Sequence, residues 1–256
     1  MMLILHFLPS FASFLPFPSF ISMEEQLADA IFSGLIHDVE PLLKHPQLDV
    51  NWADESGSTA LHHASYNGQT EIVKLLLAHP AINVNVKNQY GVTSLSQVCL
   101  RSLLPVLELL LRHHDVDLTL ADENNRTPLW YAAANGHLDV IECLVASGKD
   151  LGDLDRKGEY YRNTYTALEI ARRLEEGEVK PLLERLMANL AQTRHEIRVK
   201  LGVLDALAAG IFALTVFLCD DLLQLKPASH LAAIPDNAAA AIRFFTIASK
   251  LPWSCR

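Results

Sequence analysis

Short helical stripes of apolar residues recur along the chain at a fixed distance. Within one stripe, such as residues 70–77, the apolar positions lie three or four apart, which is the spacing of one face of a helix. Three segments align on this pattern: residues 57–77, 91–111 and 125–145. Two leucine columns keep a step of 34 across all three: Leu61, Leu95 and Leu129, and Leu76, Leu110 and Leu144. The pattern predicts a helical repeat.

Each unit also carries signals that begin and end a short first helix. A threonine stands before it, where the hydroxyl can accept a backbone N–H as an N-cap: Thr59, Thr93 and Thr127. Pro128 fits the first helical position, and Gly68 and Gly136 fit the end of the helix. A second helix and a short extended link then follow. Two short helices and a link are therefore predicted for each unit.

Two of the units carry a recognisable motif. The segments TALHHASYNGQ and TPLWYAAANGH resemble the ankyrin-repeat signature, whereas TSLSQVCLRSL lacks its Pro, His and Gly. The resemblance implies an all-α ankyrin-repeat solenoid, built of helix-turn-helix repeats with β-turn fingers. It also implies that His62, at the signature histidine, hydrogen-bonds backbone between repeats.

The array extends beyond the three aligned segments. Residues 27–43 repeat the columns one step earlier, and residues 166–183 repeat them 39 residues after the third unit, with five extra residues in a polar finger. Three repeats are about the minimum for a stable stack, because each unit buries its face only against its neighbours. We expect about five repeats over residues 24–190, with these approximate bounds: 24–56, 57–90, 91–124, 125–158 and 159–190.

The first 22 residues are apolar, rich in Phe and Pro, and free of Asp, Glu, Lys and Arg. A secretory signal or membrane anchor is one interpretation. Against it, the segment has no basic start and no A-x-A cleavage site, and Pro9, Pro16 and Pro18 would interrupt a helix. We expect residues 1–22 to lie outside the fold, with the functional start at Met23.

Residues 193–256 do not follow the repeat. Apolar positions from 201 to 225 fall at helical steps, and Asn237 could cap a second helix to residue 250. Residues 201–219 could instead span a membrane, but Asp205 lies inside them. We favour a helical capping segment that covers the end of the stack and is cut short at its C-terminus. It resembles the tail of fungal ankyrin repeat-containing proteins.

Composition and motifs exclude several function classes. The net charge is −9, so nucleic acid is a disfavoured partner. The four cysteines form no C-x-x-C pair, and phosphate-binding, dinucleotide-binding and hydrolase motifs are absent, so we predict no metal, no cofactor and no catalytic residues. The alternative is that residues 193–256 carry out an enzymatic or membrane-linked function. Asn125-Arg126-Thr127 is a glycosylation sequon that coincides with the N-cap threonine.

A non-catalytic scaffold for protein–protein interaction is the predicted function. The family resemblance implies that a protein partner binds the concave face made by finger tips and first helices. Carried onto this sequence, the partner-binding positions are Glu55, Ser58, Tyr66, Asn67, Lys87, Gln89, Tyr90, Arg101, Glu123, Asn124, Arg126 and Asn135. We expect a monomer in the cytoplasm or nucleus; the alternative is a secreted or membrane-associated protein that uses residues 1–22 or 201–219.

Overall fold

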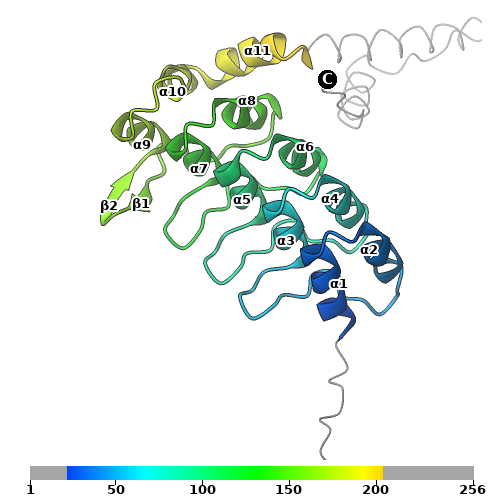
Figure 1. Ribbon diagram of the computed structural model, residues 1–256. Coiled ribbons are helices and arrows are strands. Elements are labelled where there is room, and N and C mark those ends of the chain that lie inside the picture. The colour runs from blue at the N-terminus through cyan, green and yellow to red at the C-terminus, as the bar shows by residue number, and fades with distance from the viewer. Residues whose placement is uncertain (1–21, 204–256) are drawn as a thin grey trace, which may run out of the picture.

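The computed structural model describes residues 22–203, which form a curved stack of helix pairs (Figure 1). The pairs are α1 (Met23–Phe32) and α2 (Ile36–Leu43), α3 (Ala60–Tyr66) and α4 (Thr70–Leu77), α5 (Ser94–Arg101) and α6 (Leu104–Arg112), α7 (Pro128–Ala134) and α8 (Leu138–Ala146), and α9 (Ala167–Arg173) and α10 (Val179–Ala188). A final helix, α11 (Leu190–Lys200), follows them, and a hairpin of β1 (Gly158–Tyr160) and β2 (Asn163–Tyr165) precedes α9. The predicted all-α solenoid is confirmed.

First helices pack in one layer and second helices in another. Helix α3 contacts α1 and α5, and α7 contacts α5 and α9, while α4 contacts α2 and α6 (Figure 1). The predicted threonine caps begin the inner helices. The hydroxyl oxygen of Thr93 accepts the Ser96 N–H at 3.2 Å, and that of Thr127 accepts the Trp130 N–H at 3.2 Å, so each satisfies a donor that the helix leaves free.

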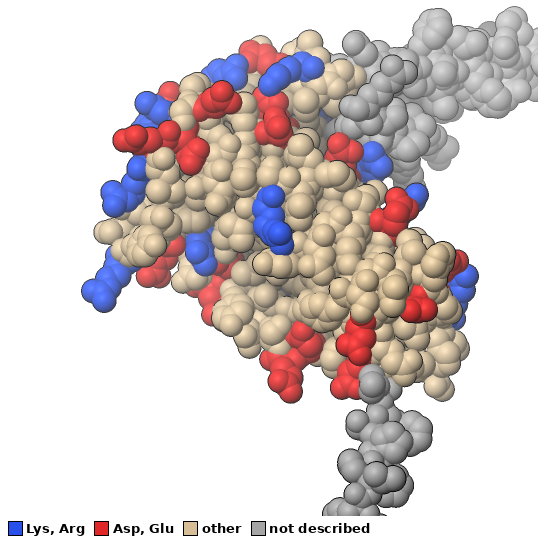
Figure 2. Space-filling model, in the orientation of Figure 1, with Lys and Arg blue, Asp and Glu red and all other residues tan. Residues whose placement is uncertain are grey.

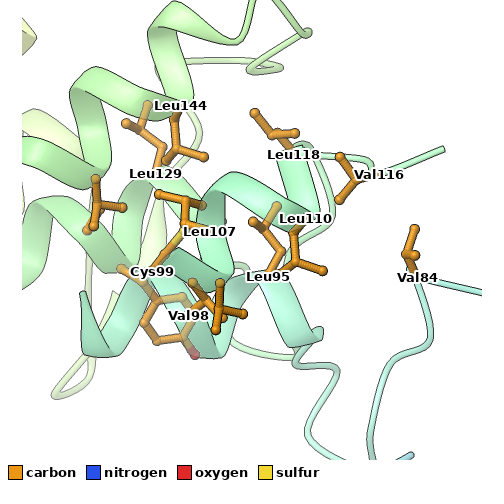
Figure 3. Packing of buried hydrophobic residues seen from close by; sticks show 14 of the residues in the cluster. Val84, Leu95, Val98, Cys99, Leu107, Leu110, Val116, Leu118, Leu129 and Leu144 are labelled. Atoms are coloured by element: carbon orange, nitrogen blue, oxygen red, sulfur yellow. The ribbon is translucent and has the colours of Figure 1, made fainter. Parts of the chain in front are cut away.

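The two leucine columns form the centre of the stack. Leu61, Leu95 and Leu129 from the inner layer and Leu76, Leu110 and Leu144 from the outer layer are all buried. Figure 3 shows Leu95 and Leu110 lying close together and the side chains of the next unit beside them. Because each unit buries its apolar face against its neighbours, the core runs the length of the stack as one cluster.

A left-handed residue ends each inner helix and turns the chain toward its outer partner. Gly34, Gly68 and Gly136 hold this position with φ of 68°. The middle unit has Ser102 there, at φ 56° and ψ 43°. The conformation is therefore kept although the glycine is missing, and a side chain is placed in a region that disfavours it.

Helix α11 covers the outer side of the fourth unit, where it packs between α8 and α10 (Figure 1). Arg194 donates to the Val145 carbonyl at 3.1 Å, and Arg198 donates to the Ala146 carbonyl at 2.8 Å. These carbonyls lie at the C-terminal end of α8, where a helix has free acceptors and favours positive charge. Helix α11 therefore contacts the fourth and fifth units, and the cover of the end of the stack by the apolar residues 201–225 stays a prediction. Residues 204–256 of the predicted segment lie outside the described residues.

No helix within residues 22–203 is both long enough and apolar enough to cross a bilayer. The N-terminal stretch up to residue 21 and most of residues 201–219, on which the signal and anchor alternatives depend, lie outside that range.

Candidate functional site

The finger loops that precede the inner helices are joined by backbone hydrogen bonds. The Gln89 N–H donates to the Ser56 carbonyl at 3.0 Å, and the Glu123 N–H donates to the Tyr90 carbonyl at 3.1 Å. The Glu159 N–H continues the series to the Asn124 carbonyl at 2.8 Å. The fingers therefore form one continuous ladder rather than separate mobile loops.

One carboxylate or amide side chain folds each of the three fingers that precede α3, α5 and α7. Asp54 Oδ1 accepts the Ser58 N–H at 2.9 Å, Asn88 Oδ1 accepts the Val92 N–H at 3.0 Å, and Asp122 Oδ1 accepts the Arg126 N–H at 2.7 Å. These acceptors stand 34 residues apart, so the repeat period could have revealed them, but the sequence prediction did not include them. Such side-chain turns stabilise a reversal of the backbone without regular structure.

The same acidic groups tie the first and third of these fingers to their helices. His63 Nε2 donates to Asp54 Oδ2 at 2.8 Å, and the Tyr131 hydroxyl donates to Asp122 Oδ2 at 2.6 Å. Burial opposes ionisation of Asp54, but hydrogen bonds from Ser56, Ser58 and His63 outweigh it and lower the pKa of Asp54 to about 2. Burial and the bond to Asp122 raise the pKa of Tyr131.

Two different side chains make the bond between neighbouring repeats. His62 Nδ1 accepts the Thr59 N–H at 3.1 Å, which leaves Nε2 protonated to donate to the Val92 carbonyl at 3.0 Å. The indole N–H of Trp130 makes the equivalent bond to the Tyr165 carbonyl at 2.9 Å. Burial lowers the pKa of His62, so the ring stays neutral in its role. The backbone bond between repeats that the resemblance implied for His62 is present.

Most of the predicted partner-binding positions are exposed. This group comprises Glu55, Tyr66, Asn67, Lys87, Gln89, Tyr90, Arg101, Glu123, Asn124 and Asn135. Arg126 is half-buried and forms an ion pair with Asp122 at 2.8 Å. Ser58 is only 8% exposed, and its hydroxyl oxygen lies within hydrogen-bond distance of that of Ser56, at 2.9 Å, so its side chain holds the finger turn and offers no contact surface.

Tyr66 and Arg101 form a pair at the ends of α3 and α5. The guanidinium carbon of Arg101 lies 4.1 Å from the Tyr66 ring centroid, and Nη1 donates to the Tyr66 carbonyl at 2.7 Å. In the next unit His137 donates to the Leu100 carbonyl at 3.1 Å, which is the corresponding acceptor one step along. Arg101 therefore makes, to the Tyr66 carbonyl, the bond that His137 makes to the Leu100 carbonyl one repeat later. Its side chain is also exposed, so it can contact a partner. Tyr66 is 50% exposed and Tyr90 is 60% exposed.

One group of side chains in the described residues has metal-binding types: His113, His114 and Asp115, whose ligand atoms lie within 4.8 Å of one another. His113 Nδ1, however, accepts the Asp115 N–H at 3.3 Å. His45 and His79, at steps of 34, accept backbone N–H groups in the same way. The Lys149 ammonium group also donates to the His113 carbonyl at 2.9 Å. The histidine at this place in the repeat holds a backbone turn in three units, and in this unit a lysine also binds beside it. This structural role accounts for the cluster.

The finger of the fifth unit, residues 158–165, contributes no residue to the predicted positions, although it carries Tyr161, whose side chain is 83% exposed. The five extra residues were visible in the sequence as a polar insertion, but the turn they form lacks the Gly or Asn that marks a tight hairpin. Figure 2 shows basic side chains projecting at the end of the stack where β1 and β2 lie, with acidic side chains beside them.

Comparison with known families gives one match. The family model described as ankyrin repeats, three copies, matches residues 27–122 and 95–193. The matched ranges overlap in the middle unit, whose signature is the poorest of the three. No curated protein matches the chain, so the resemblance of the tail to fungal proteins stays a prediction.

Proposed function

Because the chain belongs to the ankyrin-repeat family, whose repeats are general protein-interaction modules, we propose that it is a non-catalytic scaffold that binds a protein partner. The binding face in this proposal is the concave side, made by the finger ladder and the ends of the inner helices. We also propose that the protein acts as a monomer in the cytoplasm or nucleus.

The finger ladder is the observation that carries this proposal. Backbone bonds from Gln89 to Ser56 and from Glu123 to Tyr90 hold the fingers in register. Exposed side chains on the fingers are thus presented from a fixed backbone. A preformed surface loses little conformational entropy when a partner binds, so more of the contact energy appears as affinity.

The exposed residue types suit a protein partner. Tyr66, Tyr90 and Arg101 are of the kinds that most often carry binding energy at protein interfaces. Tyr66 is held by the Arg101 guanidinium, and Tyr90 lies in the finger whose turn Asn88 folds. We propose these three as the anchors and the neighbouring polar finger residues as the rim.

The ionisable groups of the repeat core support a scaffold without catalysis. Asp54, Asp122 and His62 each bind backbone or neighbouring side chains of the stack itself. A general acid or base must reach the proton that it transfers in a substrate. These three groups are engaged in holding fingers and repeats together.

A photo-crosslinking experiment tests the binding face. A benzophenone amino acid is placed at position 90 of the full chain, and at position 74 on the outer helix α4 as the matched control, since Lys74 is also exposed. We expect position 90, but not position 74, to capture a specific protein from cells, and Tyr66→Ala to reduce that capture severalfold. Equal capture from both positions would contradict a concave binding face.

A further inference from the structure

The finger of the fifth unit, which precedes α9, is a β-hairpin, and none of its residues is among the partner-binding positions proposed above. Strand β1 pairs with β2 in antiparallel register, Gly158 opposite Tyr165 and Tyr160 opposite Asn163. The two-residue turn between the strands is Tyr161-Arg162, with φ of 45° and 66°. A two-residue hairpin turn needs positive φ, which Asn-Gly supplies far more easily than Tyr-Arg. Backbone strain of this kind, kept under two exposed side chains, suggests that the side chains have a function.

The exposed tip is fixed to the core through a chain of aromatic rings. Tyr161 packs edge-on against Tyr160 with ring centroids 4.6 Å apart, and Tyr160 lies 6.2 Å from Trp130. Trp130 is buried and bonds the Tyr165 carbonyl. Gly158 lies so close to Arg126 that a Cβ would approach its Cγ to 2.7 Å. The base of the hairpin is therefore packed tightly on the core, and the exposed Tyr161 ring contacts it through Tyr160.

The outer edge of β2 ends the finger ladder. In an antiparallel hairpin, paired residues alternate between exchanging hydrogen bonds and pointing their backbone groups outward. The Glu159 N–H points outward, since it donates to the Asn124 carbonyl of the preceding finger. Its partner Thr164 must then direct its N–H and C=O to the opposite side. Within residues 22–203 no further finger follows to accept them, so β2 presents an open edge.

An open cleft with basic walls lies along this edge. It is lined by Lys157, Thr164, Tyr165, Glu169, Arg172 and Arg173, which bring three cations against one carboxylate. Lys157 lies 3.6 Å from Glu169, and Arg172 pairs with Glu184 at 2.7 Å. Arg173 has no ion pair among the described residues and lies over the Tyr165 ring at 5.7 Å. The cleft therefore has positive charge to offer a ligand.

We propose that the β2 edge, the basic cleft and the Tyr161 tip form a second binding site for an extended acidic segment of a protein partner. Backbone groups of the segment pair with Thr164, as in strand addition to a sheet edge. Its Asp or Glu side chains bind Arg173 and Lys157, and an apolar or aromatic residue packs on Tyr161. The inference rests on the proposed function in one respect: that the chain binds a protein.

Binding is measured by fluorescence anisotropy on the full chain. The probe is a fluorescein-labelled ten-residue peptide of alternating Glu and Thr, compared with the Lys-Thr analogue and with a Glu-Thr peptide N-methylated at alternate backbone nitrogens. We expect saturable binding of the acidic peptide that weakens with added salt, and binding at least roughly tenfold weaker for both analogues. Equal binding of the Lys-Thr peptide, or of the N-methylated one, would overturn the proposal, as would displacement by an equal concentration of inorganic phosphate.

Variants separate a binding role from a structural one. Arg173→Gln should weaken the acidic peptide roughly tenfold, while the exposed control Lys74→Gln on α4 leaves binding unchanged. The double variant Tyr161→Asn with Arg162→Gly should weaken the peptide yet raise the melting temperature, because it removes the strain of the turn. Unchanged peptide affinity in either the Arg173 or the turn variant would refute the site.

The two proposals fail in different ways. Tyr90→Ala removes a concave anchor and should leave the acidic peptide bound as before. Loss of peptide binding in that variant would show that the hairpin is not an independent site. Absence of specific cross-linking at position 90 would remove the concave face alone, because the peptide measurement does not depend on it.

Discussion

Ser102 stands at the left-handed end of α5, where the flanking units have glycine. The backbone bonds of the turn are kept: the Leu103 N–H donates to the Val98 carbonyl at 3.3 Å, as the Gln69 N–H donates to the Ala64 carbonyl at 3.0 Å. The two turns are therefore closely similar, with φ of 56° at Ser102 and 68° at Gly68, although the Ser102 N–H donates to the Val98 carbonyl and the Gly68 N–H to the Ser65 carbonyl. We predict that Ser102→Gly stabilises the protein.

The magnitude follows from two opposing effects. An L-residue in the left-handed region costs about 1–2 kcal/mol relative to a relaxed conformation. Relief of this strain by Ser102→Gly is a gain in stability. Glycine loses more backbone freedom than serine on folding, and this entropy cost offsets about 0.4–1 kcal/mol of the gain. The difference between the two ranges is about 0–1.6 kcal/mol, so the expected increase in the free energy of unfolding is about 0.8 kcal/mol.

Urea unfolding followed by circular dichroism measures this change as a higher midpoint with an unchanged slope. The matched control is Gly68→Ser, where a Cβ would meet Leu103 Cδ2 at an ordinary 3.5 Å, so the conformation rather than a clash sets the cost. The control should lose about as much stability as Ser102→Gly gains. A lower midpoint for Ser102→Gly would refute the reasoning, since the turn would then depend on the serine side chain.

Three further predictions concern the stack. Leu110→Ala should cost about 2–5 kcal/mol in urea unfolding because it empties a buried column position, while Gln89→Ala on an exposed finger should stay within about 0.5 kcal/mol. Trp130→Phe removes the donor to the Tyr165 carbonyl and should cost about 0.5–1.5 kcal/mol, measured against Trp52→Phe, a half-buried tryptophan outside that interface. Because the folded pKa of Asp54 is about 2, below its ordinary 3.8, its stabilisation is complete above pH 3.8 and should be lost as pH falls toward 2; unfolding of Asp54→Asn should vary less with pH over that window.

The sequence predicted the stack because its signal is periodic. The column of Leu76, Leu110 and Leu144 repeats one buried position in three units, so the sequence alone indicates the two layers and the residues buried in them. The hairpin and α11 have no such repetition. The turn at Tyr161-Arg162 contains no residue that favours positive φ, and Asn189, whose side chain accepts the Gln192 N–H at 3.0 Å to begin α11, is a single cap before a polar helix.

The candidate face was predictable in outline only. Position in the repeat indicates which residues lie in a finger, but exposure depends on which finger side chains fold the turn. Ser58 and Gln89 both belong to fingers, yet the Ser58 N–H bonds Asp54 and its side chain is buried, whereas the Gln89 side chain is exposed. Asp54, Asn88 and Asp122 determine which finger residues are bound into the turn and which stay exposed. A search for one invariant residue misses this column because it holds Asp in two units and Asn in the third.

The middle unit explains why a poor signature can still be a sound repeat. A hydrogen bond between repeats needs a donor at the right place rather than one residue type, so Trp130 can do what His62 does, and Arg101 can reach the acceptor that corresponds to the one His137 bonds. Ser96 is the exception, because its hydroxyl lies 3.1 Å from that of Thr93 within its own unit. The third unit is still bonded to the fourth, because His137 donates to the Leu100 carbonyl and Lys149 donates to the His113 carbonyl, beside the packing of the leucine columns. Departures from the motif change which side chains make the bonds, whereas the spacing of buried leucines preserves the fold.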